Sequence, residues 1–210
     1  RTGREKMPAG YYAAMRGHLR IVKKFPIEML AKFYQPVGSE GRTKTILLGA
    51  VYGNEVAVVD WLLWKKVPVT IGGQKPIQPI DVAAELEEYA IFQRFVPYMS
   101  DIEMTNKLAG WIFEGRRELF EMVIVHFDKR HLKIPPWTQQ ANFLLCAIEG
   151  GRHSARRDTE KNLNKTDIAF ALIDRGEPLN PPLKESADWW TSHSPLTFAL
   201  RNQNLRVVRY

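Results

Sequence analysis

The chain has 210 residues with 45% hydrophobic content, which is enough for one large or two small hydrophobic cores. Thirty Lys and Arg against 23 Asp and Glu give a net charge of +7, which favours anionic partners without identifying one. No apolar run reaches the roughly 20 residues of a membrane-spanning helix, and a single cysteine excludes an internal disulfide, so we expect an intracellular protein, cytoplasmic or nuclear.

One pattern recurs along the chain after a short N-terminal tail (1–6): a short helix rich in small residues, a polar turn, and a second helix with an apolar stripe. In the first copy, Ala13 and Ala14 precede Gly17, and apolar residues recur at helical spacing until Pro26, where we expect the helix to end. The copies lie near 7–40, 42–72, 75–100, 104–133, 138–180 and 194–210.

The second and third copies keep the small residues. In the second, Gly49 and Ala50 precede Gly53, and we interpret Glu55 as an extra residue that shifts the register. In the third, Ala83 forms half of the small pair, which lets two helices approach closely. The pattern therefore predicts helical hairpins rather than isolated helices.

The remaining copies are less regular. The fourth has bulky Trp111 at the small position but keeps Gly115, and the fifth is interrupted by an insertion at 150–165. The sixth ends soon after it begins. Because Leu205, Val207 and Val208 should need a partner stripe from a following copy, we expect the natural chain to continue past Tyr210.

These copies resemble ankyrin repeats, whose pattern T-P-L-H-x-A-A-x-x-G-H-x-x-I-V-x-x-L-L is matched best by residues 194–210 and 167–180. The resemblance implies an all-α fold, a solenoid of helical hairpins with loop insertions, forming a single domain over 7–210. It also implies a monomeric scaffold for protein–protein interaction, without catalysis or a cofactor. The contacts would come from a concave face and from the finger loops.

The resemblance places the partner-binding positions between the small pair and the turn of each first helix. These are Met15, Arg16, Val51, Tyr52, Glu85, Leu86, Phe113, Glu114, Ile148, Glu149, Arg201 and Asn202. Several are apolar, so they either form a docking strip or pack between helices. Trp189 and Trp190 in a long loop either contact the partner or fold back onto neighbouring helices.

A second interpretation assigns function to positive charge. The insertion carries Arg152, Arg156 and Arg157, which could contact nucleic acid or anionic lipid. A solvated loop is the simpler interpretation, and exposed aromatic residues for base stacking are not evident. A third interpretation is that the chain is a spacer or a regulatory arm for an enzyme elsewhere in a longer polypeptide.

The sequence favours no catalytic or metal site. The spacing of His126, Asp128 and His131 follows no zinc signature. Cys146 lies in an apolar stretch, so we expect it to be buried and unreactive. The segment 38–45, GSEGRTKT, lacks the contiguous Gly-Lys-Ser/Thr of a phosphate-binding loop.

Overall fold

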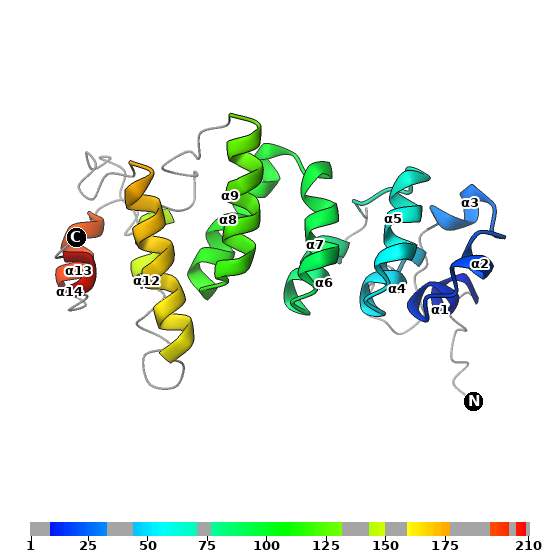
Figure 1. The fold of residues 1–210 in the computed structure, drawn as a ribbon, viewed down its shortest axis with the longest axis horizontal. Helices are drawn as coiled ribbons and strands as arrows, with labels where there is room; N and C mark the ends of the chain where they lie inside the picture. The colour runs from blue at the N-terminus through cyan, green and yellow to red at the C-terminus, as the bar shows by residue number, and fades with distance from the viewer. Residues whose placement is uncertain are drawn as a thin grey trace. The chain divides into compact units, whose positions relative to one another are not determined.

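A computed structural model describes residues 9–32, 44–70, 77–131, 143–149, 159–176, 194–201 and 205–208. Within these residues every element is a helix, either an α-helix or one short 3₁₀ helix (Figure 1). This confirms the all-α class that the apolar spacing predicted. The chain divides into two compact units, Arg1–Tyr98 and Met99–Tyr210. The division falls two residues before the end of the predicted third copy, 75–100, and each unit is described by itself.

The described residues of the first unit form three helical hairpins and two short additional helices. Its elements are α1 (Ala9–Met15), α2 (Leu19–Val22), α3 (Ile27–Leu30), α4 (Ile46–Tyr52), α5 (Val56–Trp64), α6 (Pro79–Glu85), α7 (Tyr89–Phe95) and η1 (Val96–Tyr98). The first helices pack in sequence, α1 on α4 and α4 on α6, and the second helices do the same, α2 on α5 and α5 on α7. Each hairpin therefore lies beside the next one along the chain.

The second unit repeats this order of contacts. Its elements are α8 (Asp101–Glu114), α9 (Arg117–Lys129), α10 (Phe143–Glu149), α12 (Thr159–Asp174), α13 (Pro195–Arg201) and α14 (Leu205–Val208). Helix α10 packs against both α8 and α13, while α12 packs against both α9 and α14. Val207, which we expected to need a partner from a following copy, is fully buried, so that expectation is corrected for this residue.

Four hairpins share one turn. In each, a backbone N–H donates to the carbonyl five residues earlier, from His18 to Ala13, Glu55 to Ala50, Glu88 to Ala83 and Arg116 to Trp111, at 2.8–2.9 Å. The residue before each donor has a positive φ: Gly17, Asn54, Glu87 and Gly115, at 54–72°. Glycine adopts this left-handed conformation without the steric cost that a Cβ adds. Glu87 carries that cost in the third hairpin.

The shared turn shows that our alignment of the second copy with the first was displaced by one residue. Asn54, and not Gly53, occupies the position of Gly17, and Glu55 occupies the position of His18. Glu55 is therefore not an extra residue. The buried pair of the second hairpin becomes Ala50 and Val51, one residue later than the pair predicted from the sequence.

Hydroxyl side chains begin several of the first helices. Thr45 Oγ1 accepts a hydrogen bond from Leu48 N at 3.0 Å, Ser100 Oγ from Glu103 N at 3.2 Å, and Ser194 Oγ from Thr197 N at 3.2 Å. Such caps satisfy amide groups that have no partner within the first helical turn. The buried hydroxyls of Thr45 and Ser194 are thus both hydrogen-bonded, as most buried polar groups are.

Candidate protein-binding surface

The candidate surface lies at the turn ends of the first helices. In the first unit, Tyr52 is 42% exposed and Leu86 is 46% exposed, and Arg16 and Glu85 are also exposed. Met15 is partly exposed. Because α1, α4 and α6 pack in sequence and end in the same turn, these residues lie in one row, here called the turn-side row.

A close backbone approach fixes the spacing of this row. A Cβ added at Gly53 would come 2.7 Å from the carbonyl carbon of Met15 and closer still to its oxygen. Only a residue without a side chain fits at such a distance. The end of α4 therefore rests directly on the end of α1, which brings Tyr52 beside the Met15 position.

Tyrosines gather next to this row. The rings of Tyr11 and Tyr12 meet edge to face with centroids 5.7 Å apart, and Lys44 Nζ lies 5.7 Å from the Tyr11 ring centroid. Burial, and then the nearby Tyr52 and Tyr12 hydroxyls, raise the pKa of Tyr11 to about 12. Tyr12 is exposed and lies one helical turn before Met15, so it extends the row. The sequence analysis missed Tyr12, although its spacing from Met15 indicates a shared face.

Two predicted contact residues are buried. Val51 has no exposed surface and Ile148 is 4% exposed, so their side chains pack in the core and are removed from the candidate surface. For Val51 the cause is the corrected register, because it occupies the position of Ala14 and Ala84. The docking strip predicted from the sequence is therefore corrected to the residues that remain exposed.

In the second unit, Phe113 is 38% exposed and Glu114 is exposed at the end of α8. Arg116 Nε donates to Glu114 Oε2 at 2.7 Å, and Lys165 Nζ lies 5.7 Å from the Phe113 ring centroid. Leu200 on α13 is also exposed and was not predicted. Several predicted residues lie outside the described part of the chain: Trp189, Trp190, Asn202, Arg152, Arg156 and Arg157, together with the side chains of Glu149 and Arg201.

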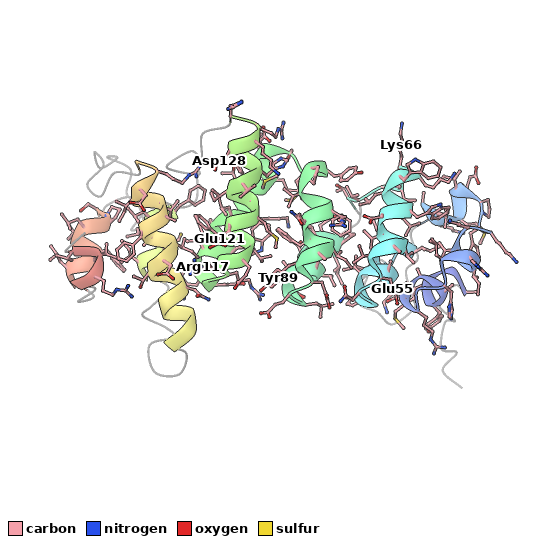
Figure 2. All side chains as sticks on the ribbon, viewed as in Figure 1. Glu55, Lys66, Tyr89, Arg117, Glu121 and Asp128 are labelled. Carbon is pink, nitrogen blue, oxygen red and sulfur yellow. The ribbon has the colours of Figure 1, made fainter. Side chains whose placement is uncertain are left out.

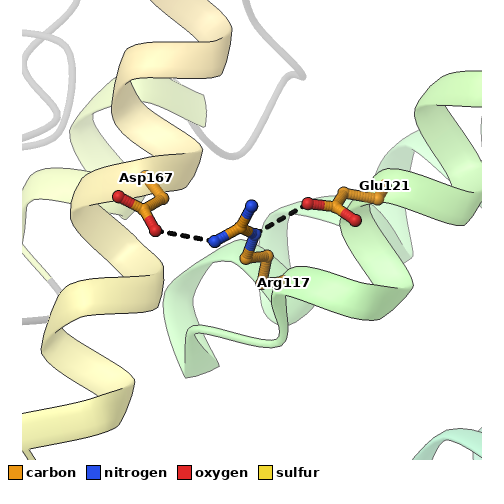
Figure 3. A network of polar contacts seen from close by, with 3 residues as sticks. All are labelled: Arg117, Glu121 and Asp167. Carbon is orange, nitrogen blue, oxygen red and sulfur yellow. Dashed lines mark hydrogen bonds and ion pairs between the residues drawn. The ribbon is translucent and has the colours of Figure 1, made fainter.

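Ion pairs connect the second helices of this unit. Arg117 Nε donates to Glu121 Oε1 on the same helix, α9, while its Nη1 donates to Asp167 Oδ2 on α12, both at 2.7 Å (Figure 3). Arg175 similarly pairs with Asp128 of α9. Because these side chains are well exposed, each pair contributes at most about 1 kcal/mol to stability. Figure 2 shows Arg117, Glu121 and Asp128 along one side of α9.

The described residues contain no group of three or more His, Cys, Asp or Glu side chains that could hold a metal ion. Cys146 is buried, as predicted. Asp128 is engaged by Arg175, which holds the pKa of that carboxyl below its ordinary value, and His131 is exposed. Nε2 of His126 is buried and makes no hydrogen bond to the described residues.

Comparison of the chain with models of known protein families and with curated protein sequences found no match. Across the described residues, no helix has both the length and the apolar character needed to cross a lipid bilayer.

Proposed function

We propose that this chain is a protein-binding module built from ankyrin-like helical hairpins, and that it recognises its partner through the turn-side row. The observation that carries the proposal is the exposure of Tyr52 and Leu86 at the turn ends of α4 and α6, with exposed Tyr12 one helical turn before the end of α1, in three helices that pack in sequence. Aromatic side chains are enriched among residues that dominate binding energy, so this row is suited to docking a protein.

The hairpin contacts support the ankyrin-like assignment. First helices pack on first helices, second helices pack on second helices, and four turns share one hydrogen bond and one positive-φ position. Stacked repeats derive their stability from such contacts between neighbours. On this proposal the chain is a monomeric intracellular scaffold, cytoplasmic or nuclear, without catalytic activity, and light scattering of the purified chain would measure its mass.

The Tyr52→Ala variant tests the proposal. A partner is first identified by affinity capture from native extract with mass spectrometry, and its affinity is then measured with purified components. We expect Tyr52→Ala to weaken binding about ten-fold, because truncation of an interface aromatic removes roughly 1–2 kcal/mol. The melting temperature should fall only slightly, since Tyr52 is 42% exposed.

Tyr98→Ala is the matched control, because Tyr98 is exposed in the same unit and lies outside the turn-side row. Its affinity for the partner should equal that of the unmodified chain. Equal weakening by both variants, or a large fall in melting temperature for Tyr52→Ala alone, would show that the row is not the binding surface.

A further inference from the structure

One edge of the Arg1–Tyr98 unit combines exposed apolar side chains with lysines. It is formed by the ends of second helices that lie away from the shared turns, and by the short α3 and η1 that follow two of them. We call it the lysine–tryptophan edge, and its members are Ile27, Met29, Trp64, Tyr98, Lys23, Lys24, Lys65 and Lys66.

The packing of the hairpins brings these residues to one edge. At the opposite edge the turns lie on one another, since a Cβ at Gly17 would meet the Glu55 carboxylate. From those turns α2, α5 and α7 run side by side, and Arg94 Nε donates to Asp60 Oδ1 at 3.1 Å between α7 and α5. Figure 1 shows α3 at the same end of this unit as the C-terminus of α5, where Figure 2 labels Lys66.

The apolar members of this edge are unusually open to solvent. Trp64 is 69% exposed and Tyr98 53% exposed, and Ile27 and Met29 are also exposed. Exposed apolar side chains that gather on one surface commonly mark an interaction site. Lys65 Nζ lies 4.4 Å from the Trp64 ring centroid, so a cation and a large aromatic ring are presented together.

The charge around the edge has one dominant sign. Among residues 21–32 and 64–70, five side chains are Lys and only Glu28 is acidic. The lysines are all exposed at helix ends. Exposed basic residues concentrated in this way attract an anionic surface.

We propose that the lysine–tryptophan edge binds the surface of an anionic lipid bilayer. Trp and Tyr rings favour the headgroup layer, where one end of the ring is apolar and the other is wet. Lysines place their ammonium groups among anionic headgroups while their methylene chains cover apolar surface.

This composition distinguishes a lipid from other anionic partners. Lysine is depleted from protein–protein interfaces, which disfavours a protein occupant. A nucleic acid backbone offers no apolar surface against which Ile27 and Met29 could pack. A bilayer does, because aliphatic side chains are stabilised at the boundary between headgroups and acyl chains. This inference does not depend on the protein-binding role of the turn-side row.

Vesicle co-sedimentation tests the proposal. The 210-residue chain is mixed with vesicles of phosphatidylcholine, with or without phosphatidylserine at about a third of the lipid. We expect binding only to the vesicles that contain phosphatidylserine, and weaker binding as salt is raised. Lys24→Glu with Lys65→Glu should reduce binding at least ten-fold, because the two reversed charges lower the net charge of the edge by four units. Trp64→Ala should reduce it several-fold.

The matched control is Arg16→Glu with Arg20→Glu, which makes the same change of charge at exposed residues near the turns. It should keep most of the vesicle binding, and circular dichroism confirms that each variant is folded. Absence of binding to phosphatidylserine vesicles, or equal losses in the two double variants, would overturn the proposal. So would tighter, Trp64-independent binding to poly(U) or polyglutamate, which would assign the edge to a nucleic acid or an acidic protein.

Discussion

Val51 and Tyr52 are adjacent in α4, yet one is fully buried and the other is 42% exposed. The difference follows from helical geometry, since successive side chains are rotated by about 100° around the axis. One face of α4 meets α1 and α6, while Tyr52 projects at the end of the helix. At this scale a register error of one residue exchanges a core residue for a surface residue.

His126 is a partly buried residue whose Nε2 atom is buried, and its protonation should affect stability. Burial, followed by the charge of Arg130, lowers the pKa of His126 below its ordinary value of 6.5, with an opposing effect from Asp101 and a further lowering by Lys129. The folded state therefore binds this proton less readily than the unfolded state. The neutral imidazole of His126 therefore contributes to the stability of the folded state above pH 6.5, and this contribution is lost as the pH falls below 6.5.

We predict that His126→Gln reduces the loss of stability between pH 7.5 and 5.5, because the variant has no imidazole to protonate. Urea denaturation at the two pH values measures this difference. His131→Gln serves as the control, because His131 is exposed, and it should keep the pH dependence of the unmodified chain. An unchanged pH dependence in His126→Gln would refute the assignment.

At the scale of elements, the short helices form through their hairpins. Helices of four to nine residues are unstable alone in water, so α1 to α7 depend on contacts with their neighbours. The shared turn directs each second helix back along the first, and the small residues Ala13, Ala50 and Ala83 occupy the start of that turn. The close approach at Gly53 then joins the first hairpin to the second.

Glycine substitutions test this contact between hairpins. Gly53→Ala should destabilise the chain by about 2 kcal/mol or more, because the added methyl group overlaps the Met15 carbonyl, which belongs to the backbone. Gly110→Ala in α8 is the control. A Cβ there meets nothing within 4 Å, and alanine should stabilise the helix by about 0.5–1 kcal/mol. Thermal denaturation followed by circular dichroism measures both changes, and equal effects would contradict the packing.

At the scale of the whole molecule, the chain consists of two units that each have a buried core. Leu47, Leu62 and Phe92 belong to the core of the first unit, and Ile112 and Phe198 to that of the second. A unit with its own core can fold separately. The single domain over 7–210 that the sequence suggested stays a prediction.

We predict that residues 1–98 and 99–210, expressed separately, each give a helical spectrum and a cooperative thermal transition. Residues 1–54 provide the control, because this cut separates α4 from α5 and exposes the apolar surface between them. That fragment should not unfold cooperatively. Failure of both longer fragments to fold would show that each unit needs the other.

Local features of the sequence were sufficient to predict the helical class and much of the core. Gly17 and Gly115 identified two turns correctly, the small residue Ala83 is buried in its hairpin, and Cys146 was correctly expected to be buried. Glu55 was wrongly interpreted as an extra residue because glycine is the usual left-handed residue, so the turn position was assigned to Gly53. Asn also tolerates that conformation, and Asn54 adopts it.

The sequence by itself determined the helices and their apolar faces, because periodicity and small-residue spacing act within a few residues of the chain. Only the tertiary structure decided which side chains are exposed. The exposure of Tyr12, Tyr52 and Trp64 depends on which helices pack together, and such contacts join residues that are distant in sequence. The candidate surfaces could therefore be located only after the hairpins were seen in contact.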